Sequence, residues 1–105
     1  MSEHTYIRVQ WLHGLQDEPV ELWSELDKER FETRKLEVFR NGAVGYASAS
    51  EAVEGTMLGT VPVPSLAEIA ADSQFRPEEI PQSEFENRWL TRRCRSCELA
   101  FPAIV

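Results

Sequence analysis

The chain has 105 residues, a formal net charge of −7 and a hydrophobic content of 42%. A chain of this length forms one domain, and it buries enough apolar surface to fold without a metal or a disulfide. Its acidic surface repels phosphate, which argues against nucleic acid and anionic membranes as partners. The sequence has no apolar run long enough to cross a membrane and no signal-peptide pattern, so we expect a cytoplasmic protein.

Two segments near the N-terminus alternate between residues of different character. In residues 5–13, Ile7, Val9 and Trp11 point one way and their neighbours point the other way. Residues 20–26 alternate in the same manner. A period of two is typical of β-strands. We therefore predict two strands joined by a polar loop.

Asn41-Gly42 is the strongest local signal, and it lies between further strand-like runs at residues 30–40 and 43–48. Both turn residues tolerate positive φ angles, so they suit the two-residue type I′ turn of a β-hairpin. Residues 57–63 could add a short fifth strand, which the prolines there would confine to an edge of the sheet. These runs predict an antiparallel meander.

The predicted turn determines which side chains share a face of the sheet. A two-residue turn pairs Glu37 with Tyr46 and Val38 with Gly45. One face then carries aliphatic side chains such as Leu36. The other face combines aromatic with charged side chains, namely Trp23, Phe31, Lys35, Glu37, Phe39 and Tyr46.

Two capping boxes mark helix starts in the C-terminal half. In each, a serine caps free backbone amides and a glutamate three residues later reaches back. The pairs are Ser65 with Glu68 and Ser83 with Glu86. Apolar residues follow both at helical spacing, which predicts two short amphipathic helices.

These elements predict an α+β fold. We expect a single antiparallel meander sheet of four to five strands, with the two short C-terminal helices packed on one face. One domain spans residues 1–105, with a core at about residues 5–90 and a C-terminal extension at residues 91–105.

The mixed aromatic and charged face has two interpretations. It is either the helix-covered core, with Lys35 and Glu37 at its rim, or an open surface that receives a partner or ligand. If Arg34 is buried, it should pair with Glu32 or Glu25, because an unpaired buried charge is costly. The open surface gives these candidate binding residues: Trp11, His13, Trp23, Phe31, Arg34, Lys35, Glu37, Phe39 and Tyr46.

Few residues carry recognisable chemistry. Cys94 and Cys97 form a C-x-x-C pair, but a zinc site needs four ligands and the sequence has no second pair. We therefore expect two free thiols, no metal and no cofactor. His13 closes a predicted strand, where a histidine is more often a polar cap than a general base. No motif names a catalytic residue, so we expect no enzymatic activity.

Several segments together resemble a known family. They include Y-I-R-V-Q-W-L-H at residues 6–13, E-R-F-E-T-R-K-L-E-V-F-R-N-G at residues 29–42 and L-G-T-V-P-V-P-S-L-A-E-I at residues 58–69. The chain resembles an uncharacterised family of short acidic bacterial proteins, a domain of unknown function, over about residues 5–90. The resemblance implies one whole domain and no particular activity, and it leaves the C-x-x-C pair outside the shared pattern.

We weigh three functions. The first is a non-enzymatic, antitoxin- or immunity-like module, a monomer or weak homodimer whose acids at residues 17–32 steer a basic protein partner to it. The second is a small-molecule-binding or hydrolytic domain with a pocket at the open sheet face. The third is a redox or metal module that uses Cys94 and Cys97.

Overall fold

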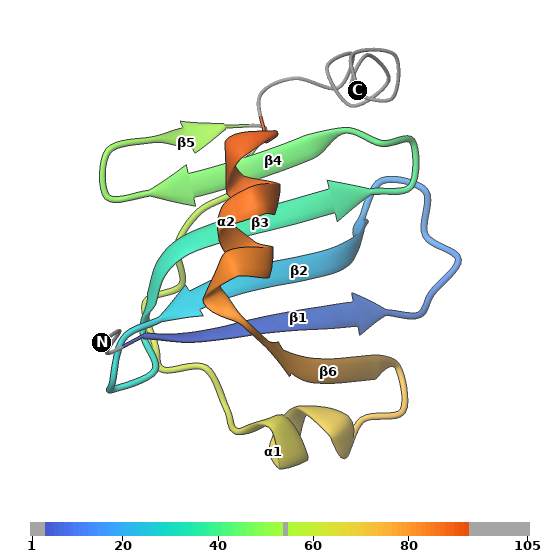
Figure 1. The fold of residues 1–105 in the computed structure, drawn as a ribbon. Coiled ribbons are helices and arrows are strands. Elements are labelled where there is room, and N and C mark those ends of the chain that lie inside the picture. The colour runs from blue at the N-terminus through green and yellow to red at the C-terminus, as the bar shows by residue number, and fades with distance from the viewer. Residues whose placement is uncertain (1–3, 54, 93–105) are drawn as a thin grey trace.

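The computed structural model describes residues 4–53 and 55–92. Within these residues, six strands form one antiparallel sheet in the order β5-β4-β3-β2-β1-β6 (Figure 1). The α+β class is confirmed, but the sheet has more strands than predicted. The strands are β1 (Thr5–Trp11), β2 (Pro19–Leu26), β3 (Glu32–Phe39), β4 (Val44–Ser48), β5 (Ala52–Val53) and β6 (Phe75–Ile80), and the helices are α1 (Leu66–Ala70) and α2 (Gln82–Leu90).

The two helices cover opposite faces of the sheet, so the prediction that both pack on one face is wrong. Helix α2 crosses one face (Figure 1), where Phe85 and Trp89 join a core with Tyr6, Trp23, Leu36, Tyr46 and Ile80. Helix α1 packs on the other face, where Leu66 and Ile69 contact a smaller cluster of Ile7, Val9 and Leu26. We call these the α2 face and the α1 face.

Strand β6 explains this placement. The sequence between the helices suggested only a connection, but Phe75–Ile80 pairs with β1, with Trp11 opposite Phe75 and Tyr6 opposite Ile80. Side chains alternate along a strand, so residues an odd number of positions apart point to opposite faces. Phe75 packs on the α1 face and Ile80 on the α2 face. The edge strand thus carries the chain from one face to the other.

The β3–β4 hairpin differs from its prediction by one residue. The Phe39 N–H donates to the Ala43 carbonyl at 2.9 Å, and the Gly42 N–H donates to the Phe39 carbonyl at 2.9 Å. Three residues therefore form the loop, and Gly42 has a φ of +92° whereas Asn41 is not in the left-handed region. A type I′ turn requires positive φ at both central residues, so this is a three-residue turn with glycine in the left-handed position.

This shift moves every side chain of β4 to the other face relative to β3. Leu36 lies opposite Tyr46, and Lys35 lies opposite Ala47. Both Leu36 and Tyr46 are buried beneath α2. The predicted open aromatic surface is therefore wrong: its largest rings are in the core, whereas Lys35 and Glu37 face the opposite side.

Of the remaining local predictions, one is confirmed and two are wrong. The Ser65 capping box is present, with the Ser65 hydroxyl accepting from the Glu68 N–H at 3.2 Å. The Ser83 box is absent, because α2 begins at Gln82 after Pro81, with no side-chain cap. Residues 57–63 run as a loop, and the short edge strand lies earlier, at Ala52–Val53.

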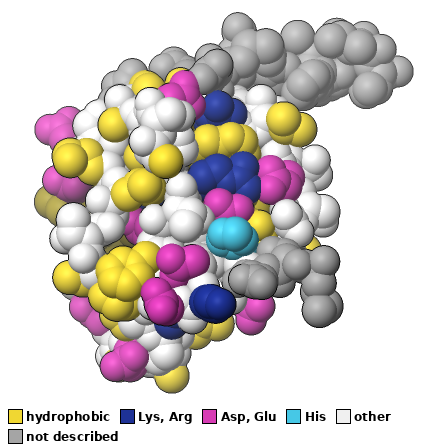
Figure 2. Space-filling model, turned by 90° about the vertical axis from the view of Figure 1, so that its left-hand side faces the viewer, with side chains coloured by type: hydrophobic (Ala, Val, Ile, Leu, Met, Phe, Trp, Pro, Cys, Tyr) yellow, Lys and Arg dark blue, Asp and Glu magenta, His cyan; other side chains and the backbone are white. Residues whose placement is uncertain are grey.

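The acids of residues 17–32 serve mainly as structural partners. Glu21 pairs with Arg8 at 2.7 Å and Glu25 pairs with Arg34 at 2.6 Å. Acidic, basic and hydrophobic side chains are interspersed on the side of the molecule drawn in Figure 2. No helix in the described part of the chain is long and apolar enough to cross a bilayer.

Candidate functional site

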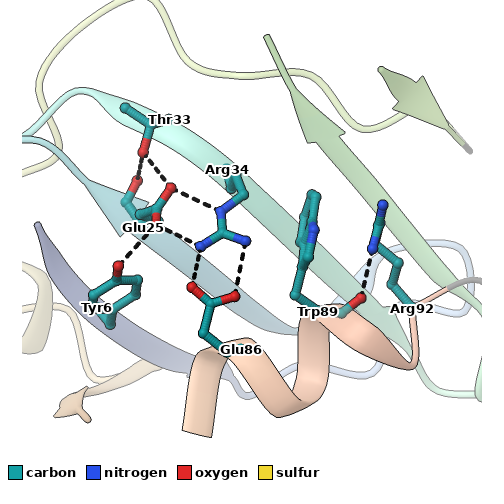
Figure 3. Close-up of polar contacts among 7 residues, drawn as sticks. All are labelled: Tyr6, Glu25, Thr33, Arg34, Glu86, Trp89 and Arg92. Carbon is teal, nitrogen blue, oxygen red and sulfur yellow. Dashed lines mark hydrogen bonds and ion pairs between the residues drawn. The ribbon is translucent and has the colours of Figure 1, made fainter. Parts of the chain in front are cut away.

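Arg34 is the centre of a polar network between the sheet and α2 (Figure 3). Its Nε and Nη2 donate to Glu25 at 2.9 and 2.6 Å, and its Nη1 and Nη2 donate to Glu86 at 3.1 and 2.6 Å. The Tyr6 hydroxyl and the Thr33 hydroxyl donate to the Glu25 carboxylate at 2.9 and 2.8 Å. Arg34 is half-buried, and it pairs with Glu25, one of the two acids predicted as its partners.

The electrostatics of this network favour a fixed structure. Burial raises the pKa of Glu25, but hydrogen bonds from Arg34, Thr33 and Tyr6 outweigh this effect and lower that pKa to about 2. The Glu25 hydrogen bonds raise the pKa of Arg34 above its ordinary value, and Glu86 adds to the effect. Because Arg34 is bidentate to both carboxylates, little of its guanidinium is left for a ligand.

The structure disperses the nine candidate residues. Trp23 and Tyr46 are each 7% exposed and belong to the α2 core. The other seven lie in four places: Arg34 beneath α2, Trp11 and His13 where β1 ends, Phe31 and Phe39 near the turns that flank β3, and Lys35 and Glu37 on the α1 face. They do not form one site.

His13 holds the β1–β2 loop. The Leu15 N–H donates to Nδ1 at 2.9 Å, so Nε2 carries the proton and donates to the Pro19 carbonyl at 2.8 Å. Both ring nitrogens are thereby used in backbone contacts. This geometry matches a polar cap and leaves no nitrogen directed at a substrate.

A different site lies on the α1 face, where the helix covers the sheet incompletely. It is a cavity of about 320 Å³, which we call the α1-face pocket. Helix α1 has only five residues and none is buried, so it cannot seal the sheet. The lining residues are Ile7, Val9, Leu22, Ser24, Glu32, Lys35, Val63, Pro64, Glu68, Ile69, Asp72 and Phe75.

The pocket has an apolar floor and a polar end. Strands β1 and β2 supply Ile7, Val9 and Leu22, and β3 supplies Glu32 and Lys35. A volume near the low end of the ligand-pocket range, mostly apolar walls and a few convergent polar groups are the usual features of a small-molecule site. The α1-face pocket has all three.

Glu32 organises the polar end. Its Oε1 accepts from the Gly59 N–H at 2.7 Å, and its Oε2 accepts from the Ser24 hydroxyl at 3.2 Å. The Lys35 Nζ lies 3.6 Å from Glu32 and 4.0 Å from Glu37. Among the described residues, the Lys35 ammonium makes these two ion pairs and no closer polar contact.

Arg30 positions the wall formed by Val63 and Pro64. Its Nε donates to the Val63 carbonyl at 2.8 Å and its Nη2 donates to the Pro64 carbonyl at 2.6 Å. The Val63 N–H donates back to the Arg30 carbonyl at 2.8 Å. Arg30 adopts a φ of 70°, a left-handed conformation that costs about 1 kcal/mol for a residue other than glycine. These hydrogen bonds offset that cost and fix the loop beside the cavity.

A wider depression lies at the β3–β4 turn. It measures about 740 Å³ and is lined by Gln16, Asp17, Phe39, Arg40, Asn41 and Ala43. Most of these residues are exposed loop side chains. The depression therefore lacks the apolar floor that would bury a ligand.

Sequence reasoning found Lys35 but missed the rest of the pocket lining. The alternation of Ile7 and Val9 and the apolar stripe containing Ile69 signalled two apolar surfaces, without showing that they face each other. The missing step was the pairing of β6 with β1, which brings Phe75 and α1 to this face.

No group of three His, Cys, Asp or Glu side chains that could hold a metal ion is present within residues 4–53 and 55–92. The predicted C-x-x-C pair, Cys94 and Cys97, lies outside the described residues.

Comparisons with known proteins give a family without an activity. No curated protein matches the chain, and no solved structure matches it. One family model matches residues 5–94, so the match ends at Cys94 and covers most of the chain. The chain belongs to the family Domain of unknown function (DUF6881).

Proposed function

We propose that this protein binds a small, mostly apolar molecule in the α1-face pocket. The observation that carries the proposal is an apolar cavity of about 320 Å³ whose floor is formed by Ile7, Val9 and Leu22. An engineered apolar cavity of about 150 Å³ holds benzene in another protein. The α1-face pocket therefore has room for one ring and a short chain.

Binding fits the pocket better than hydrolysis does. Ser24 donates to Glu32 at 3.2 Å, which resembles a nucleophile and its base. However, both Glu32 oxygens are already engaged, Oε1 by the Gly59 N–H and Oε2 by the Ser24 hydroxyl, and Lys35 lies 3.6 Å away. We therefore infer that the pair shapes the polar end of the pocket.

A basic protein partner is our second candidate function, and the net charge of −7 favours it. Asp17, Glu18 and Glu29 are exposed and can contribute to steering. Of the proposed aromatic anchors, Trp23 and Tyr46 are buried, which leaves Phe31 as the most exposed. For either function we expect a cytoplasmic protein that is a monomer or weak homodimer.

A matched pair of variants tests the pocket. Val63→Trp places a large ring in the wall of the cavity, whereas Val61→Trp makes the same change two residues away, at a side chain that is 68% exposed. Binding of small aromatic probes is measured by thermal shift, because a ligand at a hundred times its dissociation constant adds about 2.7 kcal/mol of stability.

We expect Val63→Trp to abolish the shift and Val61→Trp to preserve it. Probes that stabilise both variants equally would show that they bind elsewhere. Probes that stabilise none of the proteins, together with recovery of a stoichiometric partner from lysate at low salt, would favour the second candidate instead.

A further inference from the structure

We infer that the ligand of the α1-face pocket is an apolar amine, with its ammonium group at the α1 rim. The inference rests on the proposed function and adds the charge and orientation of the ligand. The pocket lining contains one cation, Lys35, and three acids, Glu32, Glu68 and Asp72. This imbalance favours a positively charged ligand over a negatively charged one.

The two ends of the pocket differ in how their charges are used. At the β3 end, Lys35 lies between Glu32 and Glu37, at 3.6 and 4.0 Å. An anionic head group there would gain Lys35 but meet two carboxylates. Because the lysine is already balanced by more than its own charge, the β3 end does not attract an anion.

At the α1 end, the acids lack a direct cation partner. Glu68 lies in α1 and Asp72 lies two residues beyond the helix end at Ala70, and both residues line the pocket. Among the described residues, neither carboxylate forms an ion pair, but Glu68 has a cation in its vicinity: hydrogen bonds from Ser65 lower the pKa of Glu68, and the more distant charge of Arg30 adds to this effect. Glu68 is bonded to the Ser65 N–H at 3.0 Å, and Asp72 accepts from the Gln74 N–H at 3.0 Å.

The apolar floor separates these ends. Ile7, Val9 and Leu22 lie on two central strands, between β3 on one side and β6 with α1 on the other. A ring over this floor can place a short aminoalkyl chain at Asp72 and Glu68. The net charge of −7 also concentrates cations near the protein and repels anions.

Three probes of matched size test the charge of the ligand: 2-phenylethylamine, 2-phenylethanol and phenylacetate. Their dissociation constants are measured at low salt by two-dimensional NMR titration of the full chain. We expect the amine to bind tightest, the alcohol several-fold more weakly and the acid weakest, because exposed ion pairs contribute modestly. Added salt should weaken the binding of the amine and leave the affinity for the alcohol nearly unchanged.

Asp72→Asn tests the position of the ammonium group. Asparagine keeps the side-chain oxygen that accepts from Gln74 and removes only the charge. We expect about a threefold to fivefold weaker affinity for the amine and no change for the alcohol. Asp17→Asn, the same change in the exposed β1–β2 loop, is the control and should change neither the affinity for the amine nor that for the alcohol.

The outcomes separate the two proposals. If the alcohol or the acid binds the pocket as tightly as the amine, the amine inference is wrong. The same follows if Asp72→Asn weakens the binding of all probes equally. In both cases the proposal that the pocket binds a ligand is retained. If no probe shifts signals of the pocket residues at millimolar concentration, the binding function itself is overturned, and the inference with it.

Discussion

The two faces of the sheet are built from similar alternating strands but are covered very differently. On the α2 face, a nine-residue helix buries Phe85 completely and Trp89 almost completely, and Arg34 ties the helix to the sheet. On the α1 face, a five-residue helix buries none of its residues and a loop completes the cover. We therefore expect the α2 face to provide most of the stability, whereas the α1 face retains an apolar cavity. A small domain can hold a binding site when a single well-packed face suffices to fold it.

Matched leucines on adjacent strands test this contrast most strongly. Leu36 is fully buried on the α2 face, whereas Leu22 is half-buried in the pocket floor. We expect Leu36→Ala to lower the free energy of unfolding by about 3–5 kcal/mol and Leu22→Ala by about 1–2 kcal/mol, because the second site already borders a cavity. Urea unfolding measures both, and equal losses would show that the faces are equally packed.

Adjacent cations on β3 provide the second test. Arg34→Ala leaves the Glu25 carboxylate buried without its main partner, so we expect a loss of about 3 kcal/mol. Lys35→Ala removes only long ion pairs on the other face and should cost less than about 1 kcal/mol. Adding Glu25→Gln to Arg34→Ala should restore part of the loss. A cost for Lys35→Ala as large as that for Arg34→Ala would contradict the distinction between the faces.

Acid should weaken the α2 face through Glu25. Its pKa of about 2 in the folded protein lies below the ordinary value of 4.5. A carboxylate with a lowered pKa stabilises the fold fully above its unfolded pKa, and this stabilisation is lost as the pH falls from 4.5 toward 2.

We therefore expect the free energy of unfolding, measured with urea from about pH 6 to about pH 3, to fall less steeply in Glu25→Gln than in the native protein. Glu84→Gln, at an exposed position of α2, serves as the control and should retain the native slope. Identical slopes in all three proteins would contradict the role given to Glu25.

The smallest expected effect concerns the β3–β4 turn, which determines the face of the sheet on which each β4 side chain lies. Gly42 has a φ of +92°, so Gly42→Ala should cost about 1 kcal/mol. Gly14 has no positive φ, and a Cβ added there would meet no atom within 4 Å, so Gly14→Ala is a matched control with little expected effect. Equal stability of the two variants in urea would argue against the three-residue turn.

Local features were predictable from the sequence. Alternation identified β1 and β2, Asn41-Gly42 located the hairpin, and the Ser65 capping box located α1. The rule that a buried charge needs a partner predicted that Arg34 would contact Glu32 or Glu25, and Glu25 is the partner in the structure. Each of these depends on neighbouring residues or on one energetic rule, which a single sequence contains.

The arrangement of the faces was not predictable in the same way. Asn-Gly fits both a two-residue and a three-residue turn, and a shift of one residue exchanges the faces of a strand. The β6 pairing depends on contacts with β1, far away in the chain, and Pro77 within β6 obscured its strand character. The pocket could not be found because it exists only where these long-range pairings meet.

A methyl-resolved NMR titration with 2-phenylethylamine can show whether the α2 face is sealed while the α1 face is open to a ligand. We expect the methyl signals of Ile7, Val9, Leu22 and Ile69 to shift together and those of Leu36 on the α2 face to stay in place. Shifts at Leu36 without shifts at Ile7 and Leu22 would contradict this expectation.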